Sequence, residues 1–195
     1  MGIFEYIGVL ISVIMGLAIT HLAVGTTKLI QNRDTAKLYV PQLLWTVNVL
    51  LYVLMIWWSM FWWSELEQWT TYHYLGITSY AIVLFMLSAT LFPYDLRADV
   101  DMEAFFFRNR VWFFGLLLLA WVLDIGETLG KDAYGLREVP PRYAIFVASM
   151  IALSITGIVS SNKRVQQSLP IAWLMLLLAY TSLATVRVIA APLGD

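Results

Sequence analysis

Long hydrophobic runs alternate with short polar connections along the whole chain. A helix needs about 20 apolar residues to cross the hydrocarbon core of a bilayer, which is about 30 Å thick. The chain offers six such runs, and their approximate bounds are Ile3–Ile30, Pro41–Ser64, Tyr72–Phe92, Val111–Leu129, Tyr143–Ser160 and Pro170–Ala191. The pattern predicts an all-α fold: a polytopic membrane protein with a bundle of six transmembrane helices, forming one domain over residues 1–195.

Two of the predicted helices begin with a proline. Pro41 and Pro170 each stand where a first helical turn tolerates a missing backbone N–H. A tryptophan follows each proline closely, Trp45 in the second helix and Trp173 in the sixth. Because tryptophan is enriched at membrane–water interfaces, we expect both helices to enter the bilayer at these prolines, on the same side of the membrane.

The segment before the fourth run, residues 99–110, carries acidic residues first, then apolar bulk, and then two arginines. This order is typical of an interfacial helix. It fits an N-terminal extension of the fourth helix equally well. In either form we expect Asp99 or Asp101 to be the N-cap residue.

The positions of lysine and arginine predict the orientation, because cytoplasmic loops carry an excess of these residues. The loops on one side of the predicted bundle contain eight of them, which are Lys28, Arg33, Lys37, Arg97, Arg108, Arg110, Lys163 and Arg164. The connection between the fourth and fifth helices, on the other side, contains Lys131, Arg137 and Arg142. We therefore expect both termini to lie outside. The opening segment has the general character of small bacterial inner-membrane proteins, which is the location that we expect.

Composition agrees with this class and narrows the chemistry. Hydrophobic residues make up 61% of the chain and charged residues 13%, so the lipid bilayer is the expected environment. The net charge of -1 offers no basic surface for nucleic acid. The chain has no cysteine, and its two histidines, His21 and His73, lie at different predicted depths with no partner at metal-ligand spacing. We predict no haem, no zinc and no other cofactor.

Rows of small residues predict where helices approach closely. The first helix carries Gly8, Ser12, Gly16 and Thr20 at four-residue spacing, and the fifth carries Ala144, Ala148, Ala152, Thr156 and Ser160 in the same way. Both helices run in the same direction in the predicted topology. We expect these faces to pack against each other, or against a second copy of the chain or another membrane protein.

Four ionisable residues inside the hydrophobic runs should lie at a similar depth near the outer surface. They are Glu5, Asp124, Glu127 and Arg187. Asp124 and Glu127 are three residues apart and share a helix face, as a guanidinium flanked by carboxylates would require. Charged groups in lipid are costly and mark functional sites by default. The plain structural alternative is a network of ion pairs at the helix ends, with long side chains that reach water.

A second polar pair lies deeper. His21 in the first helix and Asn48 in the second fall at comparable levels, and their side chains are able to hydrogen-bond across helices, with Thr20 or Ser88 as further partners. No acid at that depth completes a proton relay with His21. A structural histidine is the plainer interpretation.

Three classes of function follow. The first is a channel or transporter for an ion, a proton or a small solute, with the outer charge cluster as its mouth or coupling site. The second is an accessory or structural subunit that binds another membrane protein, a lipid or a hydrophobic ligand. The third, an intramembrane enzyme, is disfavoured because one deep histidine without a matching nucleophile makes a poor catalytic set. The transported species is not specified by any motif.

Overall fold

The computed structural model describes residues 2–95 and 99–190, with side chains described up to residue 182. The described residues form six α-helices and contain no strand. The helices are α1 (Ile3–Gln31), α2 (Val40–Ser59), α3 (Thr71–Ala89), α4 (Met102–Ala133), α5 (Tyr143–Val159) and α6 (Lys163–Ala190), and a 3-10 helix, η1 (Met60–Glu65), continues α2. The prediction of an all-α fold is confirmed.

Four segments are long and apolar enough to cross a membrane, namely α1, α2 together with η1, α3 and α4. The fifth helix, α5, is apolar but has 17 residues. These lengths and compositions are those of a membrane protein, as the sequence predicts.

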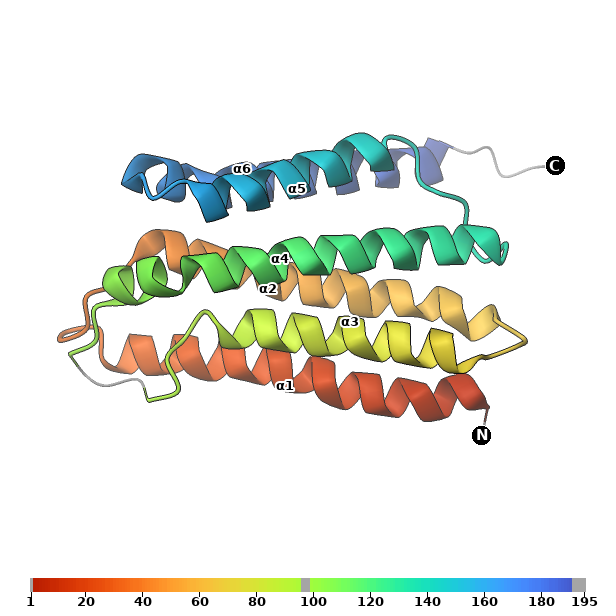
Figure 1. Cartoon of the computed structure of the whole chain (residues 1–195), viewed down its shortest axis with the longest axis horizontal. Helices are drawn as coiled ribbons and strands as arrows, with labels where there is room; N and C mark the ends of the chain where they lie inside the picture. The colour runs from red at the N-terminus through yellow and green to blue at the C-terminus, as the bar shows by residue number, and fades with distance from the viewer. Residues whose placement is uncertain (1, 96–98, 191–195) are drawn as a thin grey trace.

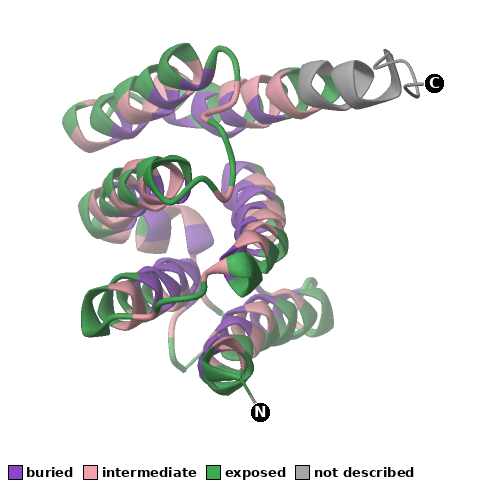
Figure 2. Cartoon of the chain, turned by 90° about the vertical axis from the view of Figure 1, so that its right-hand side faces the viewer, coloured by how far each residue is buried: buried purple, intermediate pink, exposed green. Residues whose placement is uncertain are grey.

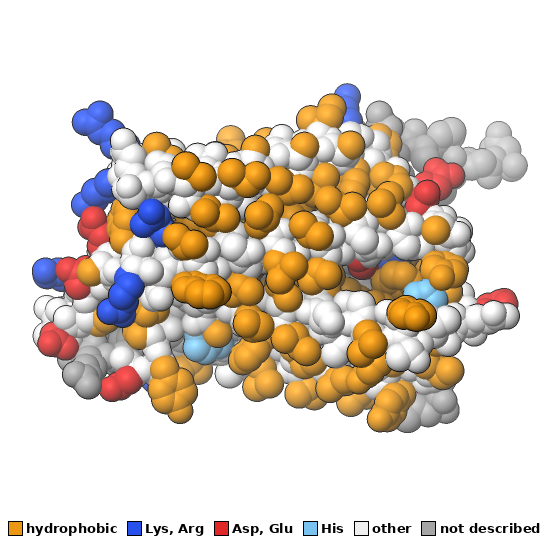
Figure 3. Space-filling model, in the orientation of Figure 1, with side chains coloured by type: hydrophobic (Ala, Val, Ile, Leu, Met, Phe, Trp, Pro, Cys, Tyr) orange, Lys and Arg blue, Asp and Glu red, His pale blue; other side chains and the backbone are white. Residues whose placement is uncertain are grey.

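The helices pack in two layers, with α1, α2 and α6 in one and α3, α4 and α5 in the other (Figure 1). Consecutive helices run in opposite directions, so the start of α1, η1 and the α4–α5 connection share one end of the bundle, which we call the terminal end. The other connections lie at the opposite end. Seen along the bundle, buried residues occupy the faces that the helices turn toward one another (Figure 2). Apolar side chains cover the middle of the surface, and most visible lysines and arginines gather at the opposite end (Figure 3).

The face that α1 buries within the chain is not the predicted row of small residues. Its buried residues follow helical spacing, and all but two of them are large: Ile7, Ile11, Met15, Ala18, Leu22, Gly25 and Leu29. Ser12 and Thr20 are exposed, and a Cβ added at Gly8 or Gly16 would meet nothing within 4 Å. Large side chains occupy most of the interior face because they form more van der Waals contacts there.

The predicted row on α5 is also exposed from Ala144 to Thr156, including Ala148 and Ala152, and only Ser160 at its end is partly buried. Moreover, α1 and α5 lie on opposite sides of the bundle, so these two faces do not pack against each other within the chain (Figure 1). Packing against a second copy or another membrane protein stays a prediction. The close approaches occur at two other glycines. The ring of Phe92 occupies the space of a Cβ at Gly25, and the ring of Phe114 does the same at Gly157.

The predicted start is confirmed for α4 and wrong for α6. Asp101 is the N-cap of α4, and its carboxylate accepts a hydrogen bond from the backbone N–H of Ala104 at 2.9 Å. The segment before the fourth run is therefore an extension of α4. The sixth helix begins at Lys163, and Pro170 lies inside it, so the expected start at this proline is wrong.

Trp45 and Trp173, expected at the membrane interface, lie in the core of the bundle. They are 0% and 1% exposed, and their ring centroids are 6.1 Å apart. The nearest rings to Trp45 include Phe113 and Phe114 of α4, at 5.1 and 5.4 Å. Amphipathic indole suits both an interface and a packed interior, so position along a hydrophobic run did not distinguish the two.

Candidate functional site

Three charged residues of α4 point into the bundle near its terminal end. Asp124, Glu127 and Lys131 are spaced by three and four residues, so they lie along one face of the helix. The Asp124 residue is 7% exposed, and the side chains of Glu127 and Lys131 are 7% and 2% exposed. Charges buried this far need partners, and the two acids find different ones.

Asp124 is held by tyrosine hydroxyls from two neighbouring helices. Tyr80 of α3 donates to Oδ1 at 3.1 Å, and Tyr143 of α5 donates to Oδ2 at 2.7 Å. The hydroxyl of Tyr52 on α2 lies 2.9 Å from that of Tyr80 and extends the chain of hydrogen bonds. Among the described side chains, no lysine, arginine or histidine forms an ion pair with Asp124.

Glu127 is neutralised by Lys131, one helical turn further along α4. Its Oε1 also accepts a hydrogen bond from Trp63 Nε1 at 3.1 Å and a longer one from Ser59 Oγ at 3.4 Å. The Lys131 ammonium donates to the carbonyl and the hydroxyl of Ser59, at 2.6 and 3.2 Å. Since Ser59 is the last residue of α2, the ammonium also meets the negative end of that helix.

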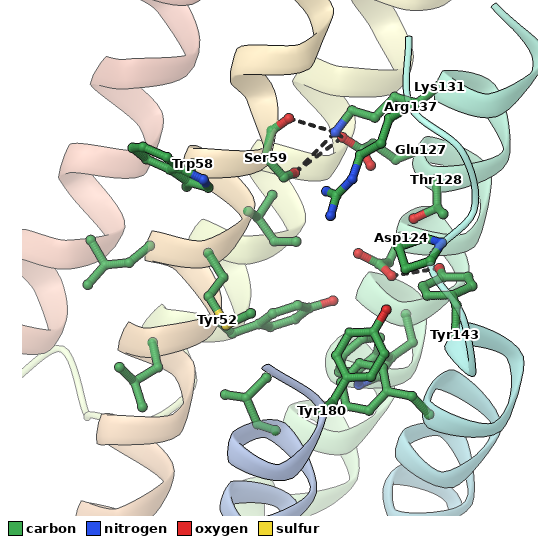
Figure 4. A pocket seen from close by; sticks show the side chains of 18 of the residues that line it. Tyr52, Trp58, Ser59, Asp124, Glu127, Thr128, Lys131, Arg137, Tyr143 and Tyr180 are labelled. Carbon is green, nitrogen blue, oxygen red and sulfur yellow. Dashed lines mark hydrogen bonds and ion pairs between the residues drawn. The ribbon is translucent and has the colours of Figure 1, made fainter. Parts of the chain in front are cut away.

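A cavity of about 380 Å³ opens beside these residues, between α2, α4, α5, α6 and the α4–α5 connection (Figure 4). Its walls are largely aromatic and aliphatic. Its charged lining residues are Asp124, Glu127, Lys131, Arg137 and Glu138. The arrangement is that of a small-molecule site: an apolar chamber with a few convergent polar groups.

A smaller hollow of about 220 Å³ lies between α3 and α4. Tyr80 and Glu127 line it, together with His73 at the start of α3. Glu127 therefore borders both spaces, and the hydrogen bond from Tyr80 to Asp124 joins one to the other.

The structure brings together part of the predicted charge cluster. Asp124 and Glu127 share a face of α4, as expected. The side chain of Arg187 lies outside the described residues. Glu5 is exposed at the start of α1, where its carboxylate accepts a hydrogen bond from the backbone N–H of Gly2 at 2.9 Å. Because α3 lies between α1 and α4, the structure does not bring Glu5 to the two acids of α4.

Lys131 is the cation that sequence reasoning missed. The prediction ended the fourth helix at Leu129 and assigned Lys131 to a loop because Gly130 follows. The helix continues through Gly130 to Ala133, and a Cβ at Gly130 would lie 3.4 Å from the ring of Trp63. The four-residue spacing of Glu127 and Lys131 is the signal that was available for this pair.

His21 and Asn48 do not form the expected hydrogen bond. Asn48 Nδ2 donates to the carbonyl of Pro170 at 2.8 Å, so it joins α2 to α6. The ring of His21 lies 6.3 Å from that of Phe92, and its Nε2 has no hydrogen-bond partner within the described part of the chain.

Comparison with known proteins identifies no relative: no protein family, no curated protein and no solved structure matches this chain. Among the described residues, no group of three or more histidine, cysteine, aspartate or glutamate side chains is placed to hold a metal ion.

Proposed function

We propose that this chain is an integral membrane protein of six transmembrane helices that moves a proton, an ion or a small solute through the cavity beside Asp124. The proposal includes α5 and α6 among the membrane-spanning helices, because they pack along the four longer apolar segments. It also includes a bacterial inner-membrane location with the terminal end outside. The gathering of lysine and arginine at the opposite end supports this orientation.

The observation that carries the proposal is the state of Asp124. Its carboxyl group is almost fully buried, it borders a cavity, and only neutral hydroxyls among the described groups bind it. An unpaired carboxylate inside a membrane protein is expensive, which makes it a functional group by default. A proton or a cation arriving through the cavity would neutralise it, and its departure would restore the charge.

Polar groups continue from this carboxyl across the bundle, from α5 to α2. The chain Tyr143–Asp124–Tyr80–Tyr52 is joined by hydrogen bonds of 2.7, 3.1 and 2.9 Å. The ring of Tyr52 then stacks on that of Trp121, with centroids 4.7 Å apart.

Beyond Tyr52, buried polar atoms without a hydrogen-bond partner within the described residues lie on α2, α4 and α6: Trp45 Nε1, Asn48 Oδ1, Trp121 Nε1, Gln166 Oε1 and Trp173 Nε1. Buried polar groups of this kind normally bind ordered water. They support a route for protons or small polar species that runs along the interior face of α2.

Reconstitution tests the proposal. Liposomes that contain the full chain and a trapped pH-sensitive dye should dissipate an imposed proton gradient faster than empty liposomes, and the same vesicles should be assayed with Na⁺ and K⁺ gradients. Asp124→Asn should reduce the active flux by about tenfold or more, since it removes the ionisable group. Asp34→Asn is the matched control, because Asp34 is exposed in the α1–α2 connection. Equal flux in Asp124→Asn and wild type would remove the cavity from the mechanism.

An accessory role is the second candidate, and the exposed row on α1 favours it. Gly8 and Gly16 have open space around them, with Ser12 exposed between them, a surface on which another transmembrane helix can pack closely. Gly16→Leu should then dissolve an oligomer or complex that wild type retains in mild detergent. A wild-type chain that purifies as a monomer without partners would count against this role.

A further inference from the structure

The cavity beside Asp124 carries an uncompensated negative charge. Three acids and two bases line it, so its formal charge is -1. Lys131 is committed to Glu127 and Ser59. The Arg137 guanidinium lies over the ring of Trp62, with its Cζ 5.4 Å from the centroid. Asp124 and Glu138 both lack an ion-pair partner among the described side chains, but Glu138 is exposed in the α4–α5 connection and Asp124 is buried in the interior.

The Asp124 carboxylate retains acceptor capacity. Two carboxylate oxygens offer about four lone-pair sites. One hydroxyl, from Tyr80, binds Oδ1, and another, from Tyr143, binds Oδ2. Each oxygen is therefore able to accept a second donor from the cavity without losing its tyrosine.

The walls around this carboxylate are aromatic and held in place by packing. Tyr52 stacks on Trp121, and Phe146 stacks on Tyr180 with ring centroids 4.1 Å apart and planes 7° apart. All four of these side chains line the cavity. Aromatic faces attract an ammonium through their negative quadrupole, and they also cover an apolar body.

A metal ion suits this chamber less well than an organic cation. Mg²⁺ and Ca²⁺ require six or more oxygen ligands, whereas the nearby tyrosine hydroxyls already donate to Asp124. No group of three or more metal-ligating side chains occurs in the described part of the chain. The cavity volume of about 380 Å³ is within the usual range for small-molecule sites.

We infer that the cavity binds a small organic monocation, an amine with an apolar or aromatic body, whose ammonium group donates to the Asp124 carboxylate and whose body lies against Tyr52, Trp121, Phe146 and Tyr180. This inference rests on the proposed function in one respect, because it names the class of solute that the transport site would take. A binding measurement tests it separately from flux.

The probe is the 2-phenylethylammonium ion, and its matched neutral analogue is 2-phenylethanol. The full chain in nanodiscs is titrated with each compound, and the heat of binding is measured by calorimetry. The ammonium should bind at least about tenfold more tightly than the alcohol, because a hydrogen bond between charged groups contributes roughly that factor. Asp124→Asn should abolish the preference. Asp34→Asn should retain it.

A second variant keeps the test decisive where Asp124→Asn fails to fold. Tyr180 is one of the four aromatic side chains placed against the ligand and is only partly buried, so Tyr180→Leu should fold and weaken binding of the ammonium by several-fold. Equal binding of the amine and the alcohol to wild type would overturn the inference. So would competition by millimolar Na⁺, which would assign the carboxylate to a metal ion.

The two proposals fail in different ways. Binding of the ammonium without any flux in liposomes would support the ligand class and refute transport. Proton flux that depends on Asp124, with no binding of the ammonium, would support transport and overturn the organic-cation site.

Discussion

The two ends of the bundle both contain lysine–carboxylate pairs, but they place them in opposite environments. At the terminal end, the side chains of Lys131 and Glu127 are 2% and 7% exposed. At the opposite end, Lys163 approaches Glu103 to 2.7 Å while the side chains remain 57% and 39% exposed. One pair is buried inside the protein and the other is exposed at its surface.

This difference in exposure predicts a difference in how much stability is lost when each ion pair is broken. An exposed ion pair contributes about 0–1 kcal/mol, since water already solvates both charges. The attraction within a buried pair is largely offset by the cost of desolvation, but removal of one partner leaves the other charge buried without compensation. At the terminal end, Lys131 therefore compensates the buried negative charge of Glu127. Asp124 is then the buried acid that borders the cavity without an ion-pair partner among the described side chains.

The largest effect is expected from breaking the buried pair. Lys131→Met should destabilise the protein by about 3–5 kcal/mol, because Glu127 would lose its cation. The measurement is the free energy of unfolding in mixed micelles. Lys163→Met is the matched control at the opposite end and should cost less than about 1 kcal/mol.

The double variant Glu127→Gln with Lys131→Met sharpens the comparison. It removes both charges, so it should be more stable than Lys131→Met alone. If Lys131→Met alone loses no more free energy of unfolding than the Lys163→Met control, the pair at the terminal end behaves like an exposed one.

The second-largest loss of stability is expected from removing a hydroxyl that donates to Asp124. Tyr143→Phe removes the 2.7 Å hydrogen bond to the carboxylate and keeps the ring. A hydrogen bond to a charged group contributes about 1.5–3 kcal/mol, so the variant should lose stability in that range. Tyr72→Phe is the control, because Tyr72 is 86% exposed at the start of α3. The same unfolding assay distinguishes the two, and equal losses would refute the role assigned to Tyr143.

The all-helical fold could be predicted from the sequence, because long apolar runs separated by short polar connections indicate helices. The site could be predicted only in part. Asp124 and Glu127 share a face by helical spacing alone, which holds whatever surrounds the helix. Lys131 is on the same helix, but the other partners come from α2, η1, α3 and α5, and no local pattern fixes which side chains these elements present.

The wrong expectations share a cause. Gly8 and Gly16 form a row that suits close packing, yet large residues on another face of α1 took the interior. Glu5 was placed by depth, and depth does not specify which helices are neighbours. Lys131 was not recognised as part of the fourth helix because Gly130 indicated a helix end before it. The helix continues through Gly130, which lies against the ring of Trp63.

The smallest effect is expected at the opposite end and depends on pH. The hydrogen bond from the Ala104 N–H, assisted by Lys37 at 3.2 Å, lowers the pKa of Asp101 below its ordinary value of 3.8. A lowered pKa in the folded state means that Asp101 stabilises the fold above the ordinary value, and this contribution is lost as the pH falls through the lowered one. The stability difference between wild type and Asp101→Asn should therefore be constant between about pH 5 and 7 and shrink below about pH 4. A difference that instead changes near neutral pH would show that another group at this end titrates with it, and would place a pH-sensitive element at the exposed end of the bundle.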